Sequence, residues 1–161
     1  MPVTRFNDAK KALYAVYQAA GLDGLNVYDS FQVTTASDID YVIVGHDGTL
    51  EADGTLAPDV LTGIFSQSNL EMPGVRSETG SVNCVLVCQS GDSSVTADRE
   101  QHASDLFGAL EDAVAANGGY PPSAPGIMFD GTLNGRWINR QSLGGVAVLV
   151  AYRVSYSTGW A

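Results

Sequence analysis

Two histidines stand beside carboxylates and are the first candidates for chemistry. Asp47 directly follows His46. His102 has Asp98 four residues before it and Asp105 three residues after it. A histidine paired with a carboxylate can act as a general base, but adjacent residues of an extended chain point in opposite directions, and no Gly-x-Ser-x-Gly nucleophile elbow accompanies either histidine. We interpret the first pair as a solvated turn and the second as an exposed, salt-bridged helix surface, and we expect no enzyme.

Acidic side chains gather in residues 46–60, which contain two copies of Asp-Gly-Thr-Leu. Asp-Gly is typical of turns, but the segment lacks the alternating ligands, central Gly and terminal Glu of a helix-loop-helix calcium site. The sequence also has no phosphate-binding glycine loop. We predict an exposed acidic loop at 46–60, flexible in the free chain, whose Asp47, Glu51 and Asp53 serve contact or repulsion instead of binding a metal. We expect no cofactor.

The two cysteines, Cys84 and Cys88, lie four residues apart in a run typical of a β-strand, so both side chains face the same side. Their Cα atoms would be roughly 13 Å apart, too far for a disulfide. No second pair of cysteines is present to complete a zinc site. We interpret them as buried core thiols.

Length and charge restrict the class of protein. The chain has 161 residues, 18 acidic and 8 basic, for a net charge of −10, and we predict a single domain over residues 1–161. Because nucleic-acid binders need lysine and arginine to neutralise phosphates, we expect no direct nucleic-acid binding. No apolar run approaches the roughly 18–20 residues that span a membrane, and the N-terminus lacks the layout of a signal peptide. We therefore expect a cytoplasmic acidic domain without a membrane partner.

Hydrophobic periodicity predicts two helices. The first covers residues 6–20, with apolar residues every three or four positions and Gly21 suited to the left-handed position after the helix end. The second begins near Thr96, ends at Gly118 and carries a buried stripe of Ala103, Leu106, Phe107, Leu110 and Val114. A Pro/Gly-rich connection at 118–131 follows it.

Strand patterns complete the order helix, four strands, helix, two strands. The first two strands, at 25–31 and 38–45, are close enough in sequence to predict a hairpin. The third and fourth strands are predicted at 62–72 and 79–91, and the last strand at 145–157, with the segment RWINRQSLGG leading into it. The fourth strand, the long helix and the fifth strand could form a βαβ-type crossover. The predicted fold class is α+β: a mixed, mostly antiparallel sheet with two helices packed on one face.

A few residues indicate contacts with other chains. Trp137 lies between Arg136 and Arg140, and tryptophan and arginine are enriched at interfaces. Arg76 and Glu78 share one face just before the core strand, where they pair either within the chain or with a neighbour. We interpret these five residues, together with the acidic loop, as candidate subunit or partner contacts.

Six segments succeed one another along the chain. The first three are an N-terminal amphipathic helix, the short strand NVYDSF and the valine-rich strand DYVIVGHDG. The last three are the Arg-x-Glu lead-in RSETGSVNCVLVCQSGD, the long helix ADREQHASDLFGALEDAVAAN and the closing strand GGVAVLVAYRVSYS. In this order, over about residues 5–156, the chain resembles the tail terminator (tail completion) proteins of long-tailed, non-contractile bacteriophages. The acidic loop and residues 119–126 match nothing definite in that pattern.

The resemblance implies a structural virion protein with an α+β fold, without catalytic activity or cofactor. Such proteins assemble in the host cytoplasm as a hexameric ring on the last ring of the tail tube, end its polymerisation and meet the head-side connector proteins. Viral DNA would pass through the lumen without specific binding, which the acidic charge suits. The alternatives are another head-tail connector or neck subunit, a tail-tube protein, or a small-ligand binding module that uses a cleft between the helices and the sheet.

Overall fold

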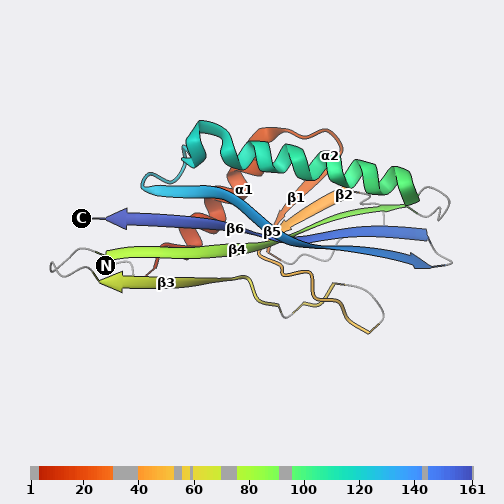
Figure 1. Cartoon of the computed structure of the whole chain (residues 1–161), viewed down its shortest axis with the longest axis horizontal. Coiled ribbons are helices and arrows are strands. Elements are labelled where there is room, and N and C mark those ends of the chain that lie inside the picture. Colours follow the sequence, from red (N-terminus) through yellow and green to blue (C-terminus); the bar gives the residue numbers. More distant parts are fainter. Residues whose placement is uncertain are drawn as a thin grey trace.

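A computed structural model of the chain describes residues 4–30, 40–52, 56–58, 60–69, 76–90, 96–142 and 145–160. In chain order its elements are α1 (Phe6–Ala20), β1 (Leu25–Asp29), β2 (Asp40–Val44), β3 (Gly63–Asn69), β4 (Arg76–Ser90), α2 (Thr96–Ala115), the 3-10 turn η2 (Ala116–Gly119), β5 (Ile127–Ser142) and β6 (Gly145–Trp160). They form the predicted α+β fold, a mixed and mostly antiparallel sheet with both helices on one face (Figure 1).

The six strands follow the order β1-β2-β4-β6-β5, and β3 also pairs with β4. One edge of β4 pairs with β3 along its first half and with β2 along its second, while its other edge pairs with β6 throughout. Because β4 and β5 both run antiparallel to β6, they are parallel to each other. The connection from β4 through α2 to β5 is therefore the expected crossover. In the sheet, β6 lies between β4 and β5.

The predicted hairpin between β1 and β2 is wrong, because these strands pair in parallel from Leu25 opposite Asp40 to Asp29 opposite Val44. Five-residue strands are only about 17 Å long. The ten residues 30–39 can span up to about 35 Å, so the chain has length enough to return to the starting end of β1. The short separation in sequence therefore did not require a tight turn.

The face of the sheet that carries the helices, called the front face, holds the larger core. Alternate residues of β4 and β6 point to it, and α1 and α2 cover them with the stripes read from the sequence. Both cysteines are buried and free in this core, as predicted. Gly21 ends α1 with φ 59° and donates its N–H to the Gln18 carbonyl at 3.2 Å, which the glycine there makes possible without strain. The central side chains are Leu13, Tyr17, Cys84, Leu86, Leu110, Val148 and Val154.

The opposite face, called the back face, has a second core, of Tyr41, Ile43, Val85, Val87, Leu149 and Ala151. The chain that follows β2 runs beneath this face (Figure 1), and its Leu50 and Leu56 pack against the core. The expected exposed loop at 46–60 is therefore exposed only in part: Thr49, Glu51, Ala52 and Pro58 are exposed, whereas His46, Gly48 and Ala57 are buried. Two leucines and a buried histidine thus attach the described part of this segment to the sheet.

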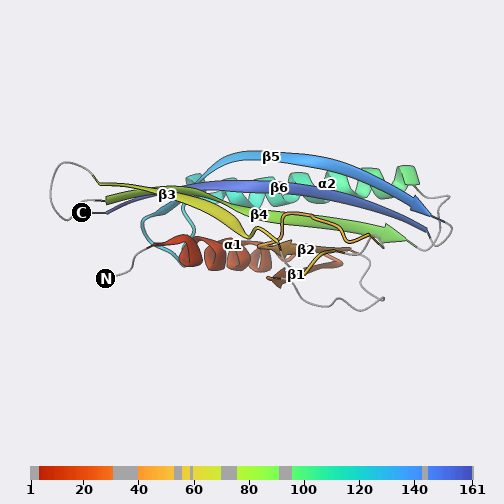
Figure 2. The same cartoon turned by 90° about the horizontal axis from the view of Figure 1, so that it is seen from below.

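Three strands are unusually long: β4 has 15 residues and β5 and β6 have 16 each, against about five or six in an average strand. The ends of β3, β4 and β6 project past both helices (Figures 1 and 2). The predicted connection at 118–131 is too long, because β5 already begins at Ile127. Ile127 and Phe129 are buried in the front core and alternate as strand residues do.

Candidate functional site

Glu78, one of the candidate contact residues, is fully buried and holds the start of α1 to the sheet. Its carboxylate accepts hydrogen bonds from the Tyr156 hydroxyl at 2.8 Å and the Gln67 amide at 3.0 Å. It also accepts the Thr4 hydroxyl at 2.7 Å and the Arg5 backbone N–H at 3.1 Å. Burial acts to raise the pKa of Glu78, but these hydrogen bonds outweigh it and lower the pKa below its usual 4.5. Glu78 is thus an internal anchor and not a surface contact.

The predicted Arg-Trp-Arg group is divided between the two faces of the sheet. Trp137 lies opposite Val150 of the front core, is 46% exposed, and donates its indole N–H to Asn139 at 3.1 Å. Arg136 and Arg140 are exposed and pair with back-face positions of β6. Consecutive strand residues alternate between faces, so the three side chains do not form one surface.

Two other candidate residues, Arg76 and Asp53, lie partly or wholly outside the described part of the chain. The backbone of Arg76 begins β4 and pairs with Asn69 and Trp160, while its side chain lies outside the described part of the chain. Asp53 lies outside the described residues altogether. Glu51 is exposed.

His46 is fully buried, which corrects its interpretation as a solvated turn residue. Its Nδ1 accepts the Gly48 backbone N–H at 2.9 Å, and its Nε2 lies 2.8 Å from the Ala57 carbonyl oxygen. A nitrogen that accepts cannot carry the proton, so Nε2 carries it and donates to Ala57. Burial lowers the pKa of His46 below 6.5 and keeps the ring neutral. His46 is therefore a structural pin of the loop.

Asp47 closes the same turn. Its carboxylate accepts the backbone N–H groups of Thr49 at 2.9 Å and Leu61 at 3.3 Å. Burial acts to raise the pKa of Asp47, but hydrogen bonds with Thr49 and Leu61 hold it below 3.8. The carboxylate is thus bound by these backbone groups, while the backbone carbonyl of Asp47 points toward Arg136 of the sheet.

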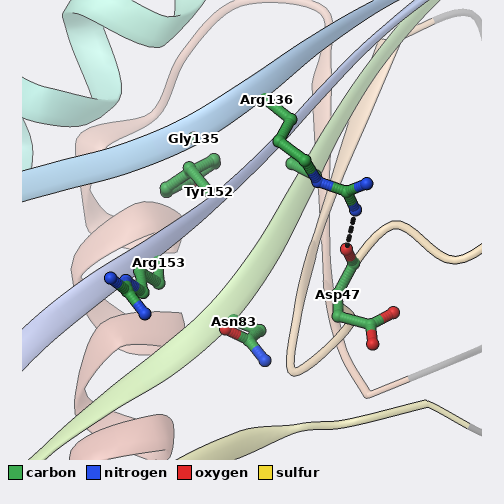
Figure 3. A pocket seen from close by; sticks show the side chains of 7 residues that line it. Asp47, Asn83, Gly135, Arg136, Tyr152 and Arg153 are labelled. Atoms are coloured by element: carbon green, nitrogen blue, oxygen red, sulfur yellow. Dashed lines mark hydrogen bonds between the residues drawn. The ribbon is translucent and has the colours of Figure 1, made fainter.

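A hollow of about 330 Å³ opens on the back face beside Asp47 (Figure 3). Arg136 of β5 and Arg153 of β6 both line it, and Arg136 Nη2 donates to the Asp47 backbone carbonyl at 3.2 Å. Asn83 of β4 completes the polar lining. Guanidinium groups bind carboxylates and phosphates through paired N–H donors, so this hollow is suited to an acidic group.

His102 also has a different partner from the one expected. Its Nε2 lies 2.9 Å from Asp40 Oδ2 at the start of β2, and Arg99 donates to the other carboxylate oxygen at 3.2 Å. Asp40 and Cys88 pair across β2 and β4, and burial raises the pKa of the Cys88 thiol to about 12. A catalytic cysteine needs a lowered pKa. The cluster therefore joins α2 to the sheet.

Large apolar side chains are exposed on and beside β3. Leu61 is 55% exposed, Ile64 53% and Phe65 51%. Among the described residues β3 pairs only with β4, so it lies at an edge of the described sheet. An exposed apolar edge strand is a site of association with another chain.

A second hollow, of about 380 Å³, lies between the C-terminal ends of α1 and α2 and is lined mainly by apolar groups. Val16 of α1, Val114 of α2 and Phe129 of β5 contribute to its lining, together with the exposed Tyr120. The alternative of a ligand cleft between the helices and the sheet stays a prediction, because this hollow lies between the two helices.

Sequence reasoning missed Arg153, Asn83 and the apolar edge at Ile64. The signal for Arg153 was present, because it is the one charged residue within an apolar strand and alternates with the buried Tyr152 and Val154. The signal for Ile64 was not, since exposure depends on which strand lies at the sheet edge.

No group of three or more His, Cys, Asp or Glu among the described residues could hold a metal ion. Within the same residues no helix has the length and apolar character needed to cross a bilayer. Comparison with models of known protein families and with curated protein sequences gave no match.

Proposed function

We propose that this chain is the tail terminator subunit of a long-tailed, non-contractile bacteriophage, a structural virion protein and not an enzyme. Copies close into a ring, a hexamer in the family that the sequence resembles. The ring sits on the last ring of the tail tube at the neck end of the tail, ends tube polymerisation and presents a joining surface to the head-side connector proteins. It assembles in the host cytoplasm, needs no cofactor, and lets DNA pass through its lumen without specific binding.

The exposed apolar edge of β3 is the observation that carries this proposal. Ile64 and Phe65 are half exposed on a strand that, among the described residues, pairs with β4 alone. Proteins that remain alone usually protect such edges with charges, prolines or covering segments. An apolar edge strand supports a role in assembly with other chains.

Growth of tail tubes observed by electron microscopy tests the proposal. Tubes polymerised with the protein present should stop at a limited length and carry a ring at one end. Ile64→Lys, which places a charge on the apolar edge, should leave the fold intact and reduce the fraction of capped tubes. Tyr120→Lys is the matched control, because Tyr120 is equally exposed, at 57%, but lies on the second hollow. Unlimited growth of uncapped tubes with the wild-type protein would rule the proposal out.

The same experiment separates the related assembly functions. A tail-tube protein would polymerise without limit by itself. A different neck subunit, such as a head-tail connector, would bind the head side and leave the tube end bare.

The apolar hollow between α1 and α2 favours one function of another class, a small-ligand binding module. Its volume of about 380 Å³ falls within the range of small-molecule sites. A ligand that raises the melting temperature of a protein remaining monomeric beside tail tubes would support this second function. Val16→Trp, which fills the hollow, should abolish that shift.

A further inference from the structure

We infer that neighbouring subunits of the ring join through two oppositely charged surfaces, the arginine-bearing back face of one copy and the outer stripe of α2 on the next. This inference rests on the proposed ring and identifies the surfaces that close it.

The receiving surface is the concave part of the back face around Arg153. This arginine is exposed and forms no ion pair within the described residues. It lines both the hollow shared with Arg136 and a neighbouring hollow of about 420 Å³. The lining of this neighbouring hollow consists mainly of small residues, so another chain can approach the sheet closely there; these are Ser66, Thr79, Gly80, Ser81, Ser155 and Ser157.

The charges around Arg153 favour an acidic occupant. Arg136 lies on the neighbouring strand, two residues from the partner of Arg153, a diagonal separation of about 7–8 Å. The Asp47 carboxylate in the same hollow is already bound to backbone N–H groups and points away from Arg136 (Figure 3). Asp130 lines the neighbouring hollow, which Arg153 also lines. Two arginines thus line this hollow beside Asp47, and the loop carboxylate is turned away from Arg136.

The chain itself supplies a matching acidic surface. Asp98, Asp105 and Asp112 recur every seven residues along α2, and all three are exposed. A seven-residue step is two helical turns and about 10 Å, so these carboxylates form one stripe on the helix side away from the sheet. Arg99, the single arginine of α2, turns to Asp40 instead. No arginine or lysine therefore interrupts the stripe.

The two surfaces lie on opposite sides of the molecule. The helix α2 covers the front face, whereas Arg136 and Arg153 belong to the back face (Figures 1 and 3). Contact between two different surfaces of identical subunits is head-to-tail, and repeated head-to-tail contacts close into a ring when the rotation allows. Opposite charges also select this contact over pairing of two like faces.

Charge reversal tests the inference by complementation. Variant A carries Arg136→Glu and Arg153→Glu, and variant B carries Asp105→Arg and Asp112→Arg. Each alone places like charges at every contact, so capped tubes should fall at least about tenfold. In an equal mixture, each A back face meets a B helix and each B back face meets an A helix, so capping should return to the wild-type level. Thermal melting checks that both variants fold, and Lys11→Glu and Asp23→Arg are exposed controls of matching sign.

The outcomes separate this inference from the proposed function. If wild-type protein forms no ring on tail tubes, the proposed function fails and the inference falls with it. If wild-type rings form and variants A and B cap tubes equally well alone, the ring stands and the inference is overturned. Failure of the mixture, with both variants folded, also overturns it, because direct pairing predicts rescue. If variant A forms rings but loses a gel shift with double-stranded DNA that the wild type shows, the arginines face DNA and not a neighbour.

Discussion

His46 is a buried histidine that must stay neutral to keep both of its hydrogen bonds. Protonation would place a second N–H at Nδ1, opposite the N–H of Gly48, and would break the turn. Because burial lowers the pKa of His46 in the folded chain below 6.5, the unfolded chain binds the proton more readily. His46 thus contributes stability that is present above pH 6.5 and lost as the pH falls.

We predict that His46→Gln flattens this pH dependence. The free energy of unfolding of the wild type, from urea denaturation, should fall as the pH is lowered from about 7 to about 5, in the range where histidine titrates. The variant should fall less over the same range. Asp47 and Glu78 do not interfere, because their lowered pKa values place their effects below pH 4.5. Parallel curves for the two proteins would contradict the assigned role of His46.

The backbone conformation at position 48 and the close approach of Ala151 both favour glycine there. Its φ is 83°, and a Cβ at this position would lie 2.7 Å from the Ala151 Cβ. Gly48→Ala should therefore cost the left-handed penalty of about 1–2 kcal/mol and about 1–3 kcal/mol more for the close contact. Gly21→Ala is the control, since its φ is 59° and nothing lies within 4 Å of its Cβ. Equal losses of stability for the two variants in thermal unfolding would show that the close approach of Gly48 to Ala151 adds no cost.

At the residue scale, properties that depend on the local sequence were predicted better than the positions of individual side chains. Burial of the two cysteines followed from strand alternation, which is a local property. The burial of His46 and Glu78 did not follow, because it depends on partners such as Ala57 and Tyr156, which lie 11 and 78 residues away in sequence. Arg136 and Trp137 were read as one group, although alternation along β5 separates them.

The helix α2 packs on the front face along the stripe that its sequence predicts, and Leu110 lies fully buried at the centre. Leu110→Ala should lower the free energy of unfolding by about 2–5 kcal/mol. Leu61→Ala is the matched control, because Leu61 is 55% exposed and should change stability by less than about 0.5 kcal/mol. A similarly small loss at Leu110 would mean that another face of α2 is buried.

The junction of α1 with β4 depends on Glu78, which accepts hydrogen bonds from four donors. Glu78→Gln replaces one acceptor oxygen by an NH₂ group that faces those donors, so it should cost about 1–3 kcal/mol. Because the pKa of Glu78 is lowered on folding, the difference between wild type and variant should shrink as the pH falls below 4.5. Chemical denaturation at neutral and acidic pH measures both effects. Asp8→Asn, at an exposed carboxylate, is the control.

Among the elements, both helices and the long core strand were predicted nearly to their ends, because each has a strong periodic pattern and glycines at its boundaries. The pairing of β1 with β2 was predicted wrongly, since short strands carry no information on direction. The connection before β5 was predicted to extend to residue 131, although the Pro/Gly-rich composition ends at Gly126 and β5 begins at Ile127. Pairing depends on neighbours across the sheet, and a single sequence does not contain that information directly.

Over the whole molecule, charge and exposure are unevenly distributed. Three carboxylates line the outer side of α2, two arginines line the hollow on the back face, and apolar side chains mark the edge at β3. A net charge of −10 would keep free subunits apart. Closure on a tail tube, which holds neighbours in place, overcomes that repulsion in the proposed function.

Native mass spectrometry of the protein mixed with tail tubes tests the central claim most directly. The proposal predicts a closed species, six times the 16.9 kDa chain mass, that is released from the tube end. Monomer in the absence of tubes is compatible with this, because the tube can serve as the template for closure. Monomer alone in the presence of intact tubes would contradict the assignment.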